Sequence, residues 1–420
     1  MTSWRITRWG LVGVACWYAA APVVCRADDT NDLREIVRQL QHQVAEQQRV
    51  INSLTEKIQH LDAVPPSEPT HGISIGKRVV LSGEAGIAFF SGDKDSQYPH
   101  AEFRIDEAKV FLDALVMDNV YFFAELNLTQ RESGDNSVDI GELYLDVENI
   151  SRFWHHDNQL SLRAGRMDIP FGEEYLMRDA IDNPLIFHTL ADFWGVDEGV
   201  EFYGKLGKVS YVFAVQNGGE PPLRDANADK SFTGRLSIDP TQWLHLSASG
   251  MRTGTIDVNG DGVAEMWFGN AYLGAIGPAA TTFHAEIAEG DVMINLPRGR
   301  IWASGGYLHF DDNDPNQNDN RDIYFYSVEG LVNATDKFYV ASRFSQILVS
   351  GGYTLVGNGN YKDYLSVLTS NLWRLSLGGG YRFNQNLVVK LDYTFEQGTE
   401  IGGDKRTHED VFAVELAAKF

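Results

Sequence analysis

From residue 77 to the end of the chain, apolar and polar residues alternate in runs that are bounded by Gly, Asn, Asp and Pro. In 387–396, for example, Leu387, Leu391 and Phe395 alternate with Lys390 and Asp392. A period of two places successive side chains on opposite faces of a β-strand. Runs of about ten residues exceed the usual strand of a soluble protein and suit a tilted strand that crosses a membrane. The pattern predicts an all-β transmembrane antiparallel barrel.

Loops and aromatic residues favour this barrel over a soluble sheet. Rings lie at strand ends, as at Tyr121, Tyr381 and Tyr393, and short turns such as 117–119 alternate with long polar loops such as 311–322. The bilayer core contains no water to hydrogen-bond the backbone groups at an open sheet edge, so a sheet that spans it must close on itself. The pattern contains seventeen candidate strands, including 264–275. Since bacterial barrels have an even number, we predict sixteen strands, with eighteen as the alternative and the doubtful strand between about 255 and 322.

The first 76 residues lack this two-residue alternation and divide into three segments of different composition. Residues 1–27 have a basic start, an apolar stretch and a small-x-small end, which predicts a secretory signal peptide; a membrane anchor or a lipoprotein signal is the alternative. Both cysteines, Cys16 and Cys25, lie in this segment, so the mature chain would hold neither a disulfide nor a thiol metal site.

Residues 28–62 carry apolar positions alternately three and four residues apart, from Leu33 to Leu61. This spacing predicts a periplasmic coiled coil that makes copies of the chain associate. The seam residues favour a parallel dimer, whereas Gln47 within the seam can specify another oligomer, and the alternative is a helix that packs on its own domain. Residues 63–76 form a Pro-rich linker to the barrel domain, 77–420.

The formal net charge of −23 argues against nucleic acid as a partner, because few basic groups are left to neutralise phosphates. On the faces that we expect to line the barrel, acidic residues outnumber basic ones. The basic residues are Lys109, Arg374, Arg382, Lys390 and Lys419, and the acidic ones are Glu107, Asp113, Glu125, Glu142, Asp146, Asp392, Glu396 and Glu415. A narrow pore with this balance favours cations or neutral solutes.

Three segments carry a resemblance to a known family: "LRAGRMDIPFGEEYL" (162–176), "DEGVEFYGKLG" (197–207) and "YRFNQNLVVKLDYTF" (381–395). They resemble the phosphate-selective porins O and P, which are trimeric channels of the bacterial outer membrane. The resemblance implies a barrel of sixteen strands with an inward-folded loop that narrows the pore, and some relatives carry a coiled coil before the barrel. It also implies a homotrimer in outer-membrane lipid. The basic ladder expected of an anion channel is not present in the strands that can be read.

The loop 169–195 is the candidate constriction, since it combines mixed charge with many rings; the alternative is that it lies outside, over the mouth. We expect its charged residues and inward strand residues to line the pore. These are Glu173, Glu174, Arg178, Asp179, Asp182 and His188 in the loop, and Lys109, Glu125, Glu142, Arg382, Lys390 and Asp392 on the strands.

Other chemistry is weakly supported. Asp257, Asn259 and Asp261 match the first half of a calcium loop, but position twelve is Phe268, so a solvated loop is the stronger interpretation. Gly72 to Gly76 matches a nucleophile-elbow spelling without a following helix, and no cofactor motif occurs.

We therefore predict an outer-membrane porin for passive diffusion of small hydrophilic solutes or ions, and not an enzyme. The alternatives are a barrel that anchors a periplasmic coiled-coil tether, and a barrel-borne lipase, for which no Ser-His pair is evident.

Overall fold

The computed structural model describes residues 72–96, 98–129, 138–193, 195–218, 228–257, 282–312, 320–353 and 368–420. The chain divides into two compact units, Met1–Ser67 and Glu68–Phe420. All described residues belong to the second unit, so the predicted signal peptide, the coiled coil and residues 63–71 of the linker lie outside them. No helix in the described ranges is long and apolar enough to cross a membrane.

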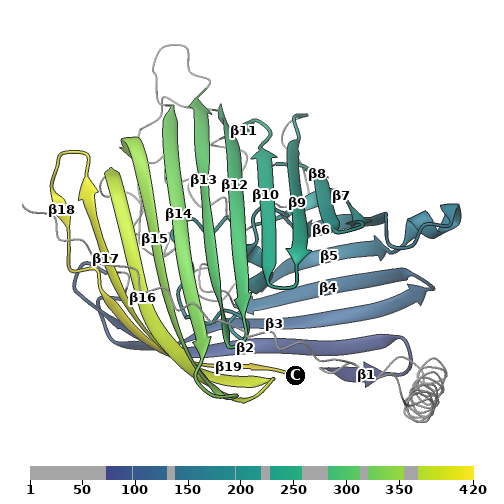
Figure 1. Ribbon diagram of the computed structural model, residues 1–420, viewed down its shortest axis with the longest axis horizontal. Helices are drawn as coiled ribbons and strands as arrows, with labels where there is room; N and C mark the ends of the chain where they lie inside the picture. Colours follow the sequence, from purple (N-terminus) through teal and green to yellow (C-terminus); the bar gives the residue numbers. More distant parts are fainter. Residues whose placement is uncertain are drawn as a thin grey trace, which may run out of the picture. The chain divides into compact units, whose positions relative to one another are not determined.

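The described residues form one antiparallel sheet of nineteen strands (Figure 1). Three strands have only two or three residues: β1 (Ile73–Ile75), β11 (Ile256–Asp257) and β18 (Lys405–Arg406). The sixteen long strands are β2 (Val79–Gly92), β3 (Glu102–Met117), β4 (Val120–Thr129), β5 (Asp139–Val147), β6 (Ser161–Asp168), β7 (Val196–Leu206), β8 (Val209–Gln216), β9 (Ser231–Thr241), β10 (Leu244–Arg252), β12 (Thr282–Leu296), β13 (Gly299–Asp312), β14 (Arg321–Asn333), β15 (Phe338–Tyr353), β16 (Thr369–Asn384), β17 (Leu387–Glu400) and β19 (Val411–Lys419). Two 3-10 helices, η1 (Ile150–Trp154) and η2 (Glu174–Met177), lie between strands.

The sixteen long strands close into a barrel. Each pairs with its neighbours along the chain, β10 pairs directly with β12, and β19 pairs with β2 from Val411↔Gly92 to Lys419↔Glu84. The predicted sixteen-stranded barrel is therefore confirmed. The seventeenth candidate, 264–275, lies outside the described residues, and the ring of strand pairs is complete without it.

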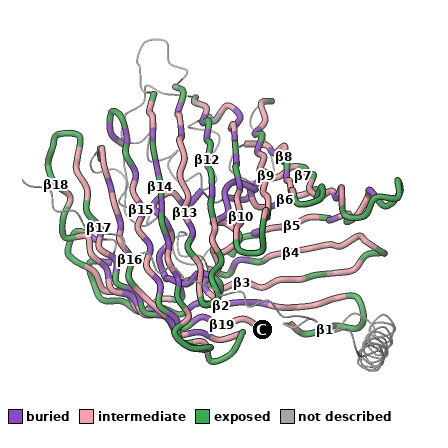
Figure 2. Tube along the Cα trace, in the orientation of Figure 1, coloured by how far each residue is buried: buried purple, intermediate pink, exposed green. Residues whose placement is uncertain are grey.

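The predicted alternation of faces is also confirmed. On β17, Lys390 and Asp392 are buried in the interior while Leu391 and Tyr393 are 50% and 38% exposed on the outside. Buried residues alternate with exposed or half-buried ones most regularly along β14, β15, β17 and β19 (Figure 2). A row of exposed apolar residues around a closed sheet is the surface that a lipid environment requires.

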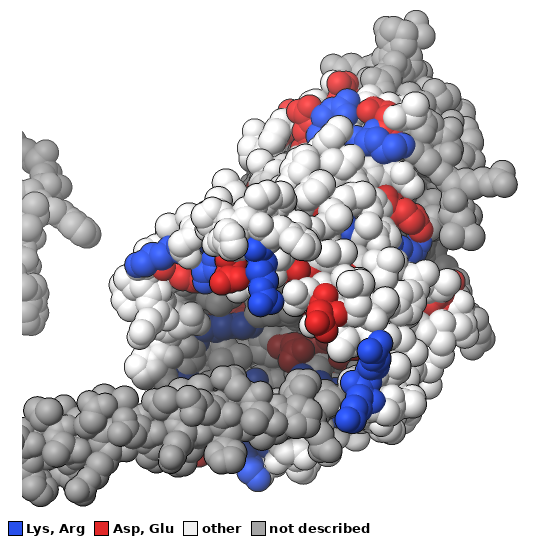
Figure 3. All heavy atoms as spheres, turned by 90° about the vertical axis from the view of Figure 1, so that its right-hand side faces the viewer, with Lys and Arg blue, Asp and Glu red and all other residues white. Residues whose placement is uncertain are grey.

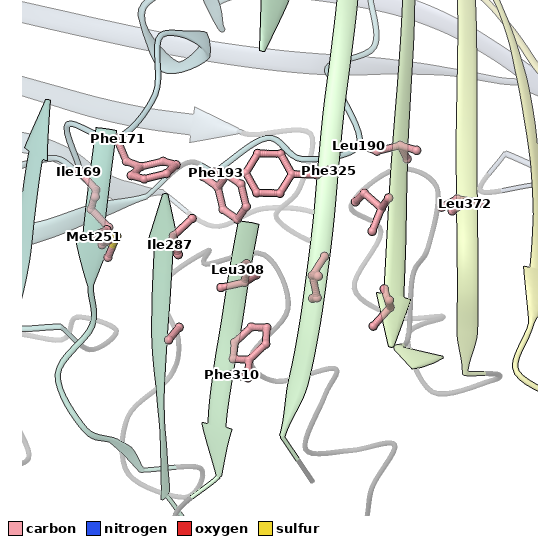
Figure 4. Packing of buried hydrophobic residues seen from close by; sticks show 14 residues of the cluster. Ile169, Phe171, Leu190, Phe193, Met251, Ile287, Leu308, Phe310, Phe325 and Leu372 are labelled. Atoms are coloured by element: carbon pink, nitrogen blue, oxygen red, sulfur yellow. The ribbon is translucent and has the colours of Figure 1, made fainter. Parts of the chain in front are cut away.

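The hydrophobic core lies inside the barrel, between the wall and the segment that connects β6 to β7. In the largest cluster, Phe171 and Phe193 of this segment pack against inward residues of β12, β13 and β14 such as Ile287, Leu308 and Phe325 (Figure 4). The rings of Phe193 and Phe325 are 4.9 Å apart, and those of Phe171 and Phe193 are 5.4 Å apart. Such burial fixes the path of this connection within the lumen.

Candidate channel constriction

The loop 169–195 leaves the wall at the end of β6 and returns at the start of β7. The amide of Ile169 donates to the carbonyl of Gly195 at 2.8 Å, which holds the two ends together. Pro170 cannot continue the strand ladder, and Gly172 has a φ of +67°, which favours glycine. The amide of Gly172 donates to Ser249 Oγ at 3.1 Å and its carbonyl accepts from Arg235 at 2.5 Å. The chain therefore turns inward instead of outward.

Charged wall residues satisfy the irregular backbone of the loop. Lys390 Nζ donates to the carbonyls of Ala180 and Leu185 at 2.6 and 3.2 Å, and the carboxylate of Asp392 accepts from the amides of Ile186 and Phe187 at 3.1 and 3.3 Å. Lys390 is 2% exposed and Asp392 is fully buried. Both face inward, as predicted, but the loop covers them, so they hold the loop instead of lining open space.

Two arginines hold the next turn of the loop in the same way. Arg343 donates to the carbonyl of Phe187 at 2.6 Å, and Arg374 donates to the carbonyl of His188 at 3.0 Å. Each basic anchor also has a buried carboxylate partner on the wall. These pairs are Lys390 with Glu415, Arg343 with Glu329, and Arg374 with Glu396, at 2.5, 2.5 and 2.8 Å. The anchors therefore add little net positive charge to the lumen.

Open space remains on the opposite side, between the loop and strands β3–β9. One cavity of about 220 Å³ is lined by β3–β7 and the loop, and a second of about 640 Å³ by β5–β9 and the loop. Glu142, Asp168 and Tyr175 line both cavities, so the two adjoin at these residues. Figure 3 shows the barrel hollowed on one side, with acidic and basic side chains on the walls of the opening.

Acidic side chains dominate the smaller cavity. Its six acidic lining residues are Asp106, Glu107, Glu125, Glu142, Asp168 and Asp179, and its two basic ones are Lys109 and Arg178. Arg178 pairs with Asp192 at 3.1 Å and Lys109 with Asp179 at 2.5 Å. Because low-dielectric walls focus the field of lining charges, this excess favours cations over anions in this cavity.

The structure brings six of the predicted pore residues together in this cavity: Lys109, Glu125, Glu142, Arg178, Asp179 and His188. Glu173 and Glu174 lie outside this cavity: Glu173 contacts the wall at β9 and β10, and Glu174 contacts the loop itself. Glu173 Oε1 lies 3.1 Å from His245 and 3.7 Å from Arg235, and Glu174 accepts from the amide and hydroxyl of Thr189 at 2.9 and 2.5 Å.

The remaining predicted residues lie apart from both cavities. Asp182 is exposed and lies 3.6 Å from Lys419, and Arg382 stacks over the ring of Tyr339 at 4.1 Å. Of the calcium candidates, Asp257 ends β11, while Asn259 and Asp261 lie outside the described residues.

The pore residues predicted from the sequence omit three acids that line the smaller cavity, Asp106, Glu107 and Asp168, of which the sequence places only Glu107 on an inward face. Asp168 is the last residue of β6, where the chain turns inward and the two-residue alternation ends; its amide donates to Glu142 at 3.0 Å. The Pro170 that follows it is the sequence signal that could have flagged this departure.

The loop carries two carboxyl groups with shifted pKa values. Burial raises the pKa of Glu174 to about 7, and nearby Asp192 adds to this rise against the opposing effects of Arg343 and Thr189. For Asp179, burial would raise the pKa, but the ammonium of Lys109 outweighs it and holds the pKa below its usual value. Asp179 therefore carries its negative charge into the cavity.

Comparison with known proteins finds similar solved structures but no similar sequence. No protein-family model matches the chain, and no curated protein matches it in sequence. Among solved structures, the trimer form of OmpT, an outer membrane protein of Vibrio cholerae, matches with a TM-score of 0.55 and 12% identity over 81% of this chain and 99% of that one. The outer membrane channel DcaP of Acinetobacter baumannii matches at 0.54 and 12% over 83% and 100%. The anion-selective porin from Comamonas acidovorans matches at 0.53 and 9% over 81% and 99%. At these identities, the likeness establishes a porin-type barrel fold.

Proposed function

We propose that this protein is an outer-membrane porin through which small hydrophilic solutes cross by passive diffusion, with the loop 169–195 as the constriction. The observation that carries the proposal is the placement of the loop. It packs against the inner wall and leaves a passage between its other side and strands β3–β9. A barrel that served only as an anchor would gain nothing from a passage of this kind.

The passage prefers cations. Its walls carry the acidic excess described above, and the basic anchors under the loop are each neutralised by a carboxylate. The resemblance to the phosphate-selective porins O and P supports the channel, whereas the charge of this passage favours solutes of the opposite sign to phosphate. Glu125, Glu142, Asp168 and Asp179 are the proposed filter residues, because each lines the smaller cavity.

The test is the reversal potential of the purified protein in planar bilayers under a salt gradient. The native channel should be cation-selective, and Glu142→Gln together with Asp168→Asn should shift the reversal potential toward anions. Asp404→Asn changes an exposed acid between β17 and β18 and should leave it unchanged. An electrically silent native protein would reject the channel and favour the tether for a coiled coil.

We also propose that the protein is a homotrimer, assembled through the barrel and the predicted coiled coil. The trimer form of the OmpT structure supports the first contact, and the heptad spacing of 28–62 supports the second. Conductance in three coupled steps, and loss of the trimer in a chain that lacks 28–62, are the expected results. A trimer that survives this deletion would assign assembly to the barrel alone.

A further inference from the structure

Lys109 of β3 reaches from the wall to the constriction loop. Its Nζ lies 2.5 Å from Asp179 Oδ1 of the loop, 3.5 Å from Glu84 Oε1 of β2 and 3.9 Å from Glu107 Oε2 of β3. A single ammonium therefore joins three carboxylates from three segments of the chain. It is the contact through which the wall at β2 and β3 holds a charged side chain of the loop.

The three carboxylates form a cage around this ammonium. One oxygen from each of Glu84, Glu107 and Asp179 lies within 4.8 Å of the others. The side chains of Glu84 and Lys109 are 7% and 14% exposed, whereas that of Asp179 is 39% exposed, so water reaches the group from the side of Asp179. Carboxylates this close repel one another unless a cation or a shared proton lies between them, and here the chain supplies a cation itself.

The cage is also part of the passage. Glu107, Lys109 and Asp179 line the smaller cavity together with Glu125. A permeating cation therefore meets a site that already holds an ammonium. If that ammonium were removed, three oxygen donors at this spacing could converge on one ion, and oxygen donors are the ligands that calcium takes.

We propose that Lys109 determines the ion specificity of the constriction. Its ammonium acts as a tethered cation that fills the cage of Glu84, Glu107 and Asp179, so that divalent cations are kept out while monovalent cations pass. This inference rests on the proposed channel function. It assigns to a basic residue the task of excluding cations of higher charge, which the acidic excess alone would attract.

The test replaces the ammonium and measures calcium block. In planar bilayers, calcium should leave the native current unchanged, whereas Lys109→Met and Lys109→Gln should be half-blocked near ~1 mM calcium, the range of weak oxygen-ligand sites. Lys109→Arg keeps the positive charge and should stay insensitive. Lys109→Met with Asp179→Ala removes one oxygen donor and should lose the block, which a merely structural role for Lys109 does not predict.

Lys94→Met is the matched control, because Lys94 is 74% exposed and pairs with Asp95 outside the cage. Manganese binding to the folded, detergent-solubilised proteins, followed by electron paramagnetic resonance, separates this inference from the channel proposal. If no variant conducts but Lys109→Met binds manganese more tightly than the native protein, the channel function is rejected and the role of Lys109 in filling the cage is supported. If folded Lys109→Met and Lys109→Gln bind manganese no better than the native protein, the proposal is overturned.

Discussion

At the scale of single residues, the inward charges of the wall have two different tasks. Lys390 faces inward with the same two-residue alternation as Lys109, but its ammonium serves loop carbonyls and Glu415. Irregular backbone at membrane depth needs partners within the protein, and an uncovered carbonyl there is costly. Lys109 instead lies at the edge of open space. The same residue type on the same sheet face is an anchor in one place and a lining group in the other.

Lys390→Met tests the anchor. The change removes the donors to Ala180 and Leu185 and leaves Glu415 buried without its cation, which costs about 3–5 kcal/mol. We expect a lower denaturation midpoint and a loosened loop that admits larger sugars in liposome swelling assays. Lys390→Met with Glu415→Gln restores charge balance, so it should recover stability while the size limit stays enlarged. An unchanged size limit in both variants would show that other contacts hold the loop.

Glu174 should make the stability of the loop depend on pH. Its pKa of about 7 in the folded protein exceeds the ordinary value of 4.5, so the folded state retains a proton that the unfolded chain has released. The stabilisation is complete below the ordinary pKa and is lost as pH rises through 7. Asp192, Arg343 and Glu289 are the charged neighbours that share this environment.

The measurement is the denaturant midpoint from about pH 5 to about pH 8. The native midpoint should fall with rising pH, and Glu174→Gln, which keeps an acceptor for Thr189, should show a flatter profile. Asp182→Asn alters an exposed acid of the same loop and serves as the control. Parallel profiles for the native protein and Glu174→Gln would contradict the assignment.

The sequence pattern could assign these residues to a face of the sheet, but not say whether the loop covers them or leaves them beside open space. The alternation correctly turned Lys109, Glu125, Lys390 and Asp392 toward the interior. Which of them the loop covers depends on contacts over 200 residues apart in sequence, such as Asp392 with Ile186. Periodicity contains no information on such contacts, so half of the predicted lining residues are elsewhere.

At the scale of elements, the sequence indicates where the constriction loop begins but not where it goes. Pro170 and Gly172 follow shortly after Asp168, where β6 ends, and neither residue suits the interior of a strand. The path beyond this point follows from packing of Phe171 and Phe193 on the wall. Aromatic content marks a segment that packs, but not the surface on which it packs.

Gly172 and Gly207 form a matched pair for testing this turn. Their φ angles are +67° and +66°, so a side chain at either position adopts the same strained backbone, at roughly 1 kcal/mol. At Gly172, an added Cβ would lie 2.7 Å from Glu289 Oε1, whereas at Gly207 nothing lies within 4 Å. Gly172→Ala should therefore lower the denaturation midpoint more than Gly207→Ala.

The same comparison reports on the pore. Gly172→Ala should also change single-channel conductance, because the chain turns into the lumen near this residue, while Gly207→Ala in a short turn should not. Equal loss of stability in the two variants would mean that Glu289 moves aside freely. A conductance change in Gly207→Ala alone would place the constriction elsewhere.

At the scale of the whole molecule, closure decides the strand count. The sequence offered seventeen candidates, and the even number required by an antiparallel ring removed one. The pairing of β19 with β2 places the first and last long strands side by side, which no local pattern could reveal. Closure follows instead from the bilayer, because an open sheet edge at membrane depth leaves a row of unpaired backbone groups.

The last residue belongs to this seam. The amide of Phe420 donates to the carbonyl of Gly83 at 2.9 Å, and its carbonyl accepts from the amide of Gly83 at 3.3 Å. An added Cβ at Gly83 would lie 2.8 Å from the Phe420 ring and 2.8 Å from the carbonyl of Lys109. The terminal ring thus lies over a position where a side chain has no room.

Deletion of Phe420 should weaken closure of the barrel. It removes two backbone hydrogen bonds, each with a net value of about 1 kcal/mol, together with the ring that covers Gly83. We expect a lower yield of folded, heat-resistant barrel when the purified chain refolds in detergent. Phe383→Ala removes an exposed ring of β16 away from the seam and should refold normally.

Refolding in detergent, without cellular factors, tests closure of the seam directly. If the shortened chain refolds fully in detergent, the seam tolerates the loss of Phe420. If it fails while Phe383→Ala refolds, the two hydrogen bonds to Gly83 are part of what closes the barrel.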